Sequence, residues 1–532
     1  MYQINRFVKG IVLVVFLLLV GCATPVENDE NENFGVKEEV APTSTSIPTN
    51  TPTSVPTNMP TPTITPTPTP NPLIPDVITE YTDSLIYEIS RDRSYYIVIG
   101  SYDQYIEQLF IPPEYNGKPV REIGYCAFYK YPNLRVVVLP NTITYISADA
   151  FSLCQELEAV KLPDSLEEIS YGTFSGCTWL REIELPESVK IIGSEAFLYS
   201  GLIKIDLPKG LTKIGEEAFA ETKISEINIP SSVTEIGLRA FGPNERYGCI
   251  ISKITVSRDN EYFRSEGNCL ISLDGTVLLG CNTSTIPNGV KIIGENAFEC
   301  CELEQVKIPN SVTEIRERAF YGSVISELIL SKNLNVIGKE AFSGAWGVDE
   351  IDLPDTLQYI GEKAFFEAIN LEKVSFSSTP EIVGITFMGC RNLKYVHLPE
   401  GITEIGKSMF NGCYNLEEIV LPSTVKSIED AAFNECSSLE MPILPDGLER
   451  IGRDAFWDCD SIDELVIPSS VKEIGGSAFG DCGSLEKCTI PATVQNLSSN
   501  IFFGSDFVTL YVEPYSAAER YAKEQGIPYI FN

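Results

Sequence analysis

Apolar and polar positions follow one pattern along most of the chain. Residues 180–197, LREIELPESVKIIGSEAF, show its skeleton, L-x-x-I-x-L-P followed by V-x-x-I-G-x-x-A-F. The closing phenylalanine recurs sixteen times, and fourteen of its fifteen intervals are 22 or 23 residues long. These marker phenylalanines are Phe128, Phe151, Phe174, Phe197, Phe219, Phe241, Phe298, Phe320, Phe342, Phe365, Phe387, Phe410, Phe433, Phe456, Phe479 and Phe502. A fixed period of this length predicts a solenoid, in which each unit buries its apolar face only against its neighbours.

Each unit is predicted to contain two short strands. In the first, Ile183 and Leu185 alternate with Glu182 and Glu184, so the apolar pair points inward and the acidic pair points outward. Pro186 then ends the strand, because proline has no N–H to donate to a neighbouring strand. The segment V-x-x-I forms the second strand, with an isoleucine five residues before the marker phenylalanine in every unit but the last.

The corners of the unit are predicted from small residues. Glycine follows the second-strand isoleucine in ten of the sixteen units, which indicates a tight bend. Val383 occupies this position in one unit, and because β-branched residues rarely adopt positive φ, a left-handed conformation is not required there. The Ala-Phe pair is expected on a short helical turn. We therefore predict a solenoid of 22–23-residue units, mainly short β-strands with short helical turns.

The N-terminus has the pattern of a lipoprotein signal peptide. Arg6 and Lys9 precede the apolar run 11–20, which is too short to span a bilayer. The run ends in Leu-Val-Gly-Cys22, which resembles the lipobox of bacterial lipoproteins. That resemblance implies removal of residues 1–21, lipid on Cys22 and attachment to a membrane. The alternative is a cysteine that happens to follow a signal peptide cleaved nearby.

Residues 22–75 are predicted to form a stalk. The segment is first polar and acidic, and from residue 41 to 72 it is nearly all Thr, Pro and Ser. It lacks the apolar content needed for a core. Proline-rich segments of this kind are semi-rigid spacers in extended polyproline II.

Residues 76–120 lack the repeat skeleton and are predicted to form an N-terminal β-cap. The apolar runs 86–89 and 95–99, separated by a polar Arg-Asp-Arg turn, predict a hairpin. The repeats then occupy residues 121–506.

Residues 507–532 are predicted to form a C-terminal β-α-β cap. The expected elements are a strand at 507–512, a helix at 516–524 and a strand at 527–531. Caps are needed because an open solenoid end exposes unpaired strand edges.

The single long interval, between Phe241 and Phe298, contains an insertion at about residues 257–283. Turn signals separate the segments 261–264, 269–273 and 276–280, which predicts an antiparallel β-meander that projects from the solenoid.

On these residues the chain resembles the BspA-like leucine-rich repeat family of surface proteins, also called Treponema-type repeats. The resemblance covers about residues 85–532 and rests on a skeleton repeated sixteen times. It implies a solenoid of leucine-rich-repeat type. Members are similar to adhesins, which implies a non-catalytic, lipid-anchored cell-surface protein that binds a protein or glycan on a host, a matrix or a neighbouring cell. The alternative is a structural or regulatory component of the cell envelope.

The composition argues against most catalytic chemistry. A single histidine, His397, excludes most histidine-based triads and two-histidine metal sites, and no P-loop is present. Carboxylate pairs recur as outward strand residues, so a solvated acidic face is favoured over a glycosidase pair. We expect no cofactor, no metal and no enzyme activity; the alternative is an enzyme with its site in the meander or the caps.

The charge balance argues against nucleic acid as a partner. The chain has 39 basic and 74 acidic residues, for a net charge of -35, whereas phosphate binding needs the opposite sign. We expect a monomer.

Cysteines recur three residues after the marker phenylalanine. They are Cys154, Cys177, Cys301, Cys390, Cys413, Cys436, Cys459 and Cys482. Other units place Ser, Thr or Ala at this position, so the requirement is for a small residue, and buried free thiols are favoured. The best candidate for a disulfide is Cys269 with Cys281 across the meander, although a two-residue turn leaves this pair about one residue out of register.

A candidate binding strip follows one outward strand position from unit to unit. In early units this position is polar, with Lys161, Glu184, Asp206, Asn228 and Thr255. In late units it becomes apolar or aromatic. The strip comprises Tyr395, His397, Val420, Ile443, Val466 and Tyr511. Aromatic and aliphatic anchors ringed by polar residues are typical of protein-binding surfaces, whereas the alternative is ordinary β-forming residues on an exposed sheet.

Overall fold

The computed structural model describes residues 71–75, 77–243, 251–440 and 443–532. These residues belong to one compact unit. The predicted signal peptide, Cys22 and nearly all of the stalk lie outside the described residues.

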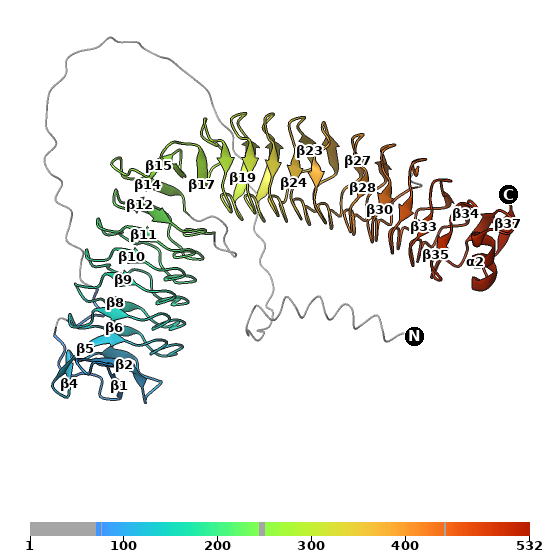
Figure 1. Cartoon of the computed structure of the whole chain (residues 1–532). Coiled ribbons are helices and arrows are strands. Elements are labelled where there is room, and N and C mark those ends of the chain that lie inside the picture. The colour runs from blue at the N-terminus through green and yellow to red at the C-terminus, as the bar shows by residue number, and fades with distance from the viewer. Residues whose placement is uncertain (1–70, 76, 244–250, 441–442) are drawn as a thin grey trace, which may run out of the picture. The chain divides into compact units, whose positions relative to one another are not determined.

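The repeats stack as rungs of a solenoid, and in most units the segment L-x-x-I-x-L forms a strand of the first ladder (Figure 1). Residues 181–186 and 201–208 form no strand, so the strand predicted around Ile183 is wrong, although Ile183 is buried and Glu184 is exposed as expected. Neighbouring strands in this ladder are parallel, as in the pairing of Ile227 with Ile254. The strands are β3 (Gln108–Phe110), β6 (Val136–Val138), β8 (Ala159–Lys161), β12 (Glu226–Ile229), β14 (Lys253–Val256), β19 (Glu302–Lys307), β21 (Val324–Ile329), β23 (Glu350–Leu353), β25 (Lys373–Phe376), β27 (Tyr395–His397), β29 (Glu418–Val420), β32 (Glu464–Val466), β34 (Lys487–Ile490), β36 (Thr509–Val512) and β37 (Tyr529–Phe531).

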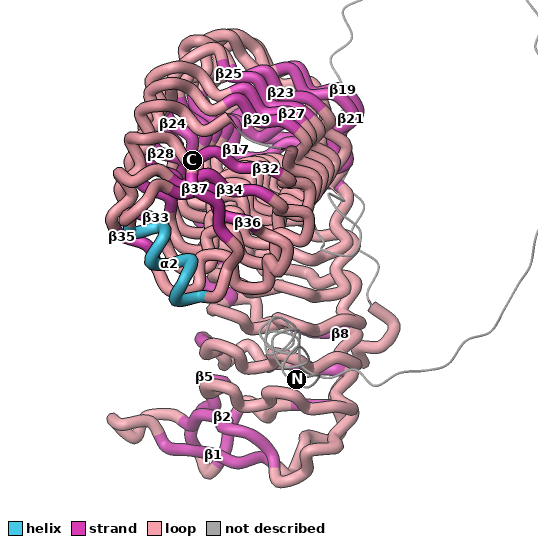
Figure 2. Tube along the Cα trace, turned by 90° about the vertical axis from the view of Figure 1, so that its right-hand side faces the viewer, coloured by secondary structure: helices cyan, strands magenta, loops and turns pink. Residues whose placement is uncertain are grey.

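The segment V-x-x-I forms a second parallel ladder, on a different face of the solenoid (Figure 2). Apart from the first, its strands are only two residues long. They are β5 (Lys118–Ile123), β7 (Tyr145–Ile146), β9 (Glu168–Ile169), β10 (Ile191–Ile192), β11 (Lys213–Ile214), β13 (Glu235–Ile236), β18 (Ile292–Ile293), β20 (Glu314–Ile315), β22 (Val336–Ile337), β24 (Tyr359–Ile360), β26 (Glu381–Ile382), β28 (Glu404–Ile405), β30 (Ser427–Ile428), β31 (Arg450–Ile451), β33 (Glu473–Ile474) and β35 (Asn496–Leu497).

The marker phenylalanines form a stacked ladder through the core. Their rings lie nearly parallel from Phe128 to Phe241 and again from Phe298 to Phe502. Phe320 and Phe342, for example, have ring centroids 5.0 Å apart and planes 4° apart. Such offset stacking adds a directional attraction to the burial of apolar area, so each rung holds its neighbours in register.

The prediction of short helical turns around the marker phenylalanines is wrong, because the chain forms hydrogen-bonded turns there instead. The N–H of Phe197 donates to the carbonyl oxygen of Ala218 in the next rung, at 2.9 Å, so it is not available for a bond along a helix. Glu195 and Tyr199, two residues before and after this marker, both have a φ of 56°. The left-handed positions thus lie on both sides of the marker, and most of them are not glycine.

The glycine after the second-strand isoleucine has a different purpose. Gly193 does not have positive φ, but a β-carbon there would lie 2.8 Å from the backbone nitrogen of Tyr171 in the preceding rung. A real side chain does not tolerate such a contact. Glycine at this position therefore permits close approach between rungs, in agreement with the expectation that no left-handed residue is required.

Both predicted caps are present. At the N-terminus β1 (Leu85–Ile89) and β2 (Tyr96–Ser101) pair antiparallel, β2 pairs parallel with β5, and β4 (Glu114–Tyr115) pairs with the start of β5. At the C-terminus α2 (Ala517–Gln525) lies between β36 and β37. The Ser516 hydroxyl accepts from the N–H of Glu519 to cap α2, and Tyr521 packs against Phe502 at the end of the ring ladder.

The inserted meander consists of β15 (Phe263–Glu266), β16 (Cys269–Ser272) and β17 (Val277–Cys281), all antiparallel as predicted. It does not project from the solenoid, however. Val277 and Leu278 of β17 pair in parallel with Ile292 and Ile293 of β18. In the rungs after the insertion, β17 is therefore the first strand of the second ladder. The projecting arrangement fails because Leu278 is fully buried against the later rungs and needs that contact.

The meander repeats the design of the N-terminal cap. In both, a Ser-x-Asp-x-Ser/Thr turn precedes a strand that starts a parallel ladder. The Ser90 hydroxyl donates to Asp92 and accepts from the N–H of Tyr95, and Ser272 does the same with Asp274 and Val277. These hydroxyl donors lower the pKa of Asp92, to about 2, and that of Asp274. The buried apolar residues correspondingly form two core clusters that meet at the meander. We conclude that the insertion is an internal cap.

The repeated cysteines are buried in the core and make a specific contact. The thiol of Cys413 donates to the carbonyl oxygen of Phe387 in the preceding rung at 3.3 Å, and six further cysteines do the same at 3.0–3.3 Å. Cys154, Cys177, Cys390, Cys413, Cys436, Cys459 and Cys482 form no disulfide. The prediction of buried free thiols is confirmed for these seven, and their hydrogen bond adds a reason for a small donor at this position.

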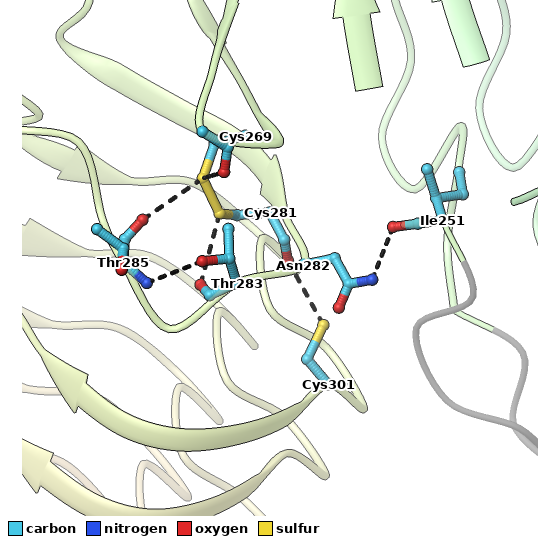
Figure 3. The surroundings of a disulfide bond; sticks show 8 residues. Ile251, Cys269, Cys281, Asn282, Thr283, Thr285 and Cys301 are labelled. Atoms are coloured by element: carbon cyan, nitrogen blue, oxygen red, sulfur yellow. Dashed lines mark hydrogen bonds between the residues drawn. A yellow bond between two sulfur atoms is a disulfide. The ribbon is translucent and has the colours of Figure 1, made fainter. Parts of the chain in front are cut away.

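Cys269 and Cys281 form the expected disulfide across the meander (Figure 3). They face each other in register, because the pairing of β16 with β17 shifts between Leu270 and Ile271. This irregularity removes the one-residue mismatch that the turn length alone implies. Close by, the thiol of Cys301 donates to the carbonyl oxygen of Cys281.

We predict that a fragment of residues 251–532 folds by itself, because the meander caps its open end. A matched fragment of residues 286–532, without the meander, should melt about 10 °C lower or aggregate, since losing a cap costs several kcal/mol and exposes a strand edge. Circular dichroism melting and gel filtration measure both outcomes. An unfolded 251–532 fragment would contradict the assignment of the meander as a cap.

We also predict steep alkaline destabilisation by the buried thiols. Burial raises the pKa of Cys390 to about 12 and that of Cys413 and Cys436 well above the ordinary value. These thiols therefore contribute stability below pH ~8.5, and it is lost as pH rises toward their folded-state pKa, at up to about 1.4 kcal/mol per pH unit for each thiol. Urea unfolding from pH 8 to 11 should show a shallower loss in a Cys413→Ala, Cys436→Ala variant. Equal slopes in the two proteins would be evidence against protonated, buried thiols.

Candidate binding surface

The predicted strip lies on the outward face of the first ladder. His397 pairs with Val420 on the adjacent strand, and both side chains are exposed, Val420 by 47%. Tyr395 belongs to the neighbouring position and pairs with Glu418. The Tyr395 hydroxyl donates to Glu417 at 3.0 Å, and this contact raises the pKa of the phenol. The structure thus brings these three predicted residues together.

The strip continues on the last strands of the same ladder. Val466, which is 53% exposed, pairs with Thr489, and Thr489 pairs with Tyr511, which is half-buried. Tyr511 in turn pairs with Ile530 on β37, the edge strand. The sequence prediction missed Thr489 and Ile530. The period of 22 or 23 residues identifies Thr489, but Ile530 follows the helix and lies outside the repeat.

Ile443 lies between the two parts of the strip and is 81% exposed. No strand is described at this rung, and the first-ladder sheet ends at β29 and begins again at β32. The neighbours Leu439 and Leu444 are buried, which places the rung in the stack. Residues 441 and 442, which include the proline that suggested a disturbed register, lie outside the described residues.

Acidic side chains flank the strip along the same strands. Glu417, Glu418, Glu440, Asp463, Glu464 and Glu486 are exposed beside it. Ion pairs between rungs offset only part of this charge, as between Lys487 and Glu464 at 3.7 Å and between Lys394 and Glu372 at 2.9 Å. The strip is therefore an apolar and aromatic surface with an acidic border.

The same position is polar in the early rungs, as the sequence predicts. Asn228 pairs with Thr255, and their side chains are hydrogen-bonded to each other. Lys161 is exposed at the end of β8. The column is polar in these early rungs and mostly apolar or aromatic from His397 onward, although Ile329 on β21 is an earlier exposed apolar member of the same column.

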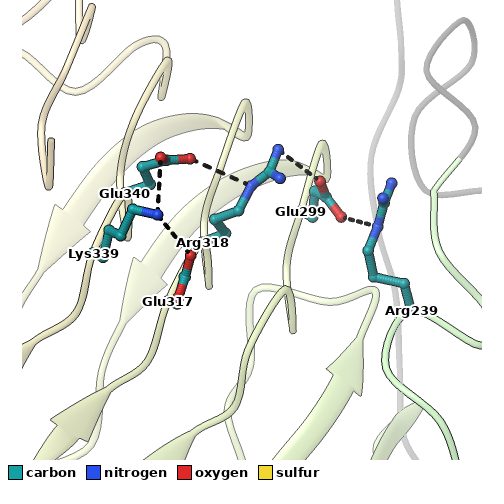
Figure 4. A network of polar contacts seen from close by, with 6 residues as sticks. All are labelled: Arg239, Glu299, Glu317, Arg318, Lys339 and Glu340. Atoms are coloured by element: carbon teal, nitrogen blue, oxygen red, sulfur yellow. Dashed lines mark hydrogen bonds and ion pairs between the residues drawn. The ribbon is translucent and has the colours of Figure 1, made fainter. Parts of the chain in front are cut away.

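A buried polar network lies beside the internal cap (Figure 4). The carboxylate of Glu299 is 3% exposed and contacts the guanidinium groups of Arg239 at 2.7 Å and Arg318 at 3.5 Å. Burial raises the pKa of Glu299, and the two arginines oppose that effect. The three residues come from three rungs around the meander. Because Glu299 is neutralised from both sides, the network joins rungs where the phenylalanine stack is interrupted.

A cavity of about 250 Å³ adjoins this network. Its lining includes Phe241, Ile254, Leu270 and Leu279 and is mostly apolar. Within the described residues it contains no nucleophile held by a base.

The described part of the chain contains no group of three or more His, Cys, Asp or Glu side chains that could hold a metal ion. Nor does it contain a helix long and apolar enough to cross a membrane.

Comparison with known proteins identifies the repeat. The family model described as BspA type leucine rich repeat region matches residues 121–246, 279–385 and 380–509, in six copies. No curated protein matches the chain.

Several solved structures resemble the chain. A leucine-rich repeat protein from Bacteroides ovatus is 24% identical, with a TM-score of 0.46, over 86% of this chain and 100% of that one. A leucine rich cell surface protein from Faecalibacterium prausnitzii is 26% identical, with a TM-score of 0.39, over 68% and 94%. A leucine-rich repeat protein from Eubacterium ventriosum is 21% identical, with a TM-score of 0.40, over 75% and 92%.

The family model covers more than half of the chain and the fold is the repeat solenoid that its skeleton predicts, so this protein belongs to the BspA-type leucine-rich repeat family.

Proposed function

We propose that this protein is a lipid-anchored, non-catalytic binding protein of the bacterial cell surface. It binds a protein or glycan ligand on a host, a matrix or a neighbouring cell through the strip from Tyr395 to Tyr511. The observation that carries this proposal is the strip itself. An apolar and aromatic column stands on an acidic sheet face, at a position where the early rungs are polar.

The geometry of the strip supports recognition of a large partner. Its members lie on successive rungs about 4.8 Å apart, so the surface is long, narrow and nearly flat. Flat apolar surfaces with a polar border are typical of protein interfaces, in which a few central side chains supply most of the binding free energy. Val420 and Val466 are the members best placed for this purpose, because both are about half exposed and point away from the core.

The sequence before the solenoid supports display outside the cell. A lipid on Cys22 would hold the protein at a membrane, and the Thr/Pro-rich stalk would hold the solenoid away from it. Reach of this kind is useful mainly for contact with something external. A structural or regulatory envelope component remains the second candidate, because a spacer that crosses a cell wall has the same composition.

We predict that a Val420→Asp, Val466→Asp double variant loses binding but keeps its fold. Both side chains point outward, so the melting temperature should change by no more than a few degrees, whereas a charge in an apolar interface should weaken binding at least tenfold. Binding is measured with the purified protein on immobilised matrix proteins, mucins and isolated cell wall.

The matched control for this experiment is Val324→Asp with Ile329→Asp. These residues are 44% and 41% exposed on β21, and the control adds the same charge. Ile329 lies in the same outward column as the strip, but Asp352 and Ser375 separate it from His397. Equal binding by both double variants would show that the ligand binds elsewhere. A large fall in melting temperature of the Val420, Val466 variant alone would show that the strip is buried.

We further predict that Cys22→Ala abolishes lipid attachment. The variant should remain uncleaved or be released, since without the cysteine there is no thiol to carry the acyl chains. Cell fractionation after detergent-free washing and metabolic labelling with a fatty acid measure the two effects. Unchanged membrane association, with no lipid label in the wild-type protein, would contradict the anchor.

A further inference from the structure

The turns of the last three complete rungs carry a surface aromatic pair, in which Trp457 is half-buried and Phe503 is exposed. Trp457 and Phe503 lie two rungs apart, with Gly480 between them at the same position of the turn. Their rings are stacked, with centroids 5.9 Å apart and planes 19° apart. Phe503 is 60% exposed, so the pair presents an aromatic surface to solvent.

Gly480 is what allows the two rings to meet. A β-carbon there would lie 2.5 Å from Cε3 of the Trp457 indole, so the ring lies directly over the glycine backbone. Any other residue would push the indole away from Phe503. Glycine at this one rung therefore creates a continuous aromatic surface across two rung spacings, or about 10 Å.

Four carboxylates stand in the positions next to this pair. Asp458 directly follows Trp457, and Asp481 directly follows Gly480. Asp460 lies two residues after Asp458, and Asp506 lies three residues after Phe503. A second glycine, Gly504, leaves room for the Asp481 carboxylate, which contacts it. Burial raises the pKa of Asp481, and so does the negative charge of Asp460 and Asp506. The carboxylates are therefore close enough to repel one another.

These carboxylates lack a basic partner within the described part of the chain. Ion pairs between rungs neutralise many other acidic residues of the solenoid, but none of the ion pairs found there involves Asp458, Asp460, Asp481 or Asp506. The Asp460 carboxylate accepts from the N–H of Gly483 at 2.9 Å, which fixes its position without changing its charge. The acidic border of the aromatic pair is thus uncompensated.

We propose that Trp457, Phe503 and these four aspartates form a second docking surface, which we call the acidic aromatic patch, for an arginine- or lysine-rich segment of a partner protein. Aromatic faces attract guanidinium and ammonium groups, and carboxylates beside the ring strengthen that attraction by direct pairing. Charge complementarity specifies the occupant. The carboxylates extend over three rungs, a length that an extended peptide covers with about three residues, so a run of basic side chains matches their spacing.

The patch is separate from the strip on the first ladder, because it lies on the turns that follow the marker phenylalanines. A result that contradicts the proposed patch can therefore be distinguished from a result that contradicts the proposed role of the strip. The Val420→Asp, Val466→Asp variant should bind the basic probe as the wild type does.

The test is isothermal titration of the folded solenoid with an acetylated, amidated hexa-arginine peptide at 150 mM salt. Asp458→Asn with Asp481→Asn should weaken binding at least tenfold, and so should Trp457→Leu. Asparagine keeps the shape of each aspartate and tolerates the left-handed conformation that both residues adopt, with φ of 59° and 50°. Melting curves confirm that each variant is folded.

The matched control is Glu182→Gln with Glu184→Gln, which removes the same charge from an exposed position in an early rung. It should bind hexa-arginine with wild-type affinity. Equal weakening in the control and the aspartate variant would reduce the effect to general attraction by the net charge of -35. Unchanged binding by Trp457→Leu, or spermine binding as tightly as the peptide, would also overturn the proposal.

Discussion

Hydrogen bonding between the backbones of adjacent rungs is the interaction on which the rest of this structure depends. Two strand ladders and the turns around the marker phenylalanines all donate from one rung to the next. A single rung has no such partners, and it cannot bury its own apolar face either. Stability is consequently a property of neighbours, as expected for a quasi-one-dimensional fold.

This dependence on neighbouring rungs explains why the solenoid has a cap at each end and a further cap at the insertion. A first or last rung leaves one edge without partners, and the hairpin of β1 and β2 and the helix α2 cover those edges. At the insertion the phenylalanine stack stops at Phe241 and resumes at Phe298, and the meander supplies a new first strand for the rungs that follow. Glu299 and its two arginines join the rungs across this point by charge. The rungs after the insertion therefore start from a cap of their own, as the first rungs of the solenoid do.

The same dependence separates scaffold from function. Inward positions and the thiols that donate to phenylalanine carbonyls are fixed by the stack, whereas outward side chains are free to vary from rung to rung. Both proposed surfaces use that freedom in the C-terminal rungs. The strip replaces polar residues with Val420 and Val466 on a sheet face, and the acidic aromatic patch uses Gly480 to let two aromatic rings meet on the turns.

The sequence by itself determined the solenoid, its period, the buried cysteines and the outward direction of the strip, because each depends on residues whose spacing matches one rung. It also determined both caps, because their strand and helix patterns depart from that spacing. It did not determine the turn conformation, since a helical turn and a turn bonded to the next rung place Ala and Phe alike. Only the tertiary structure decided that Glu195 and Tyr199 are left-handed, that β17 joins the second ladder, and that Cys269 faces Cys281 through a register shift. It also decided that Trp457 reaches Phe503 over a glycine. Each of these features depends on a contact between two segments that are distant in the sequence. The pattern within one segment does not show which other segment it will contact.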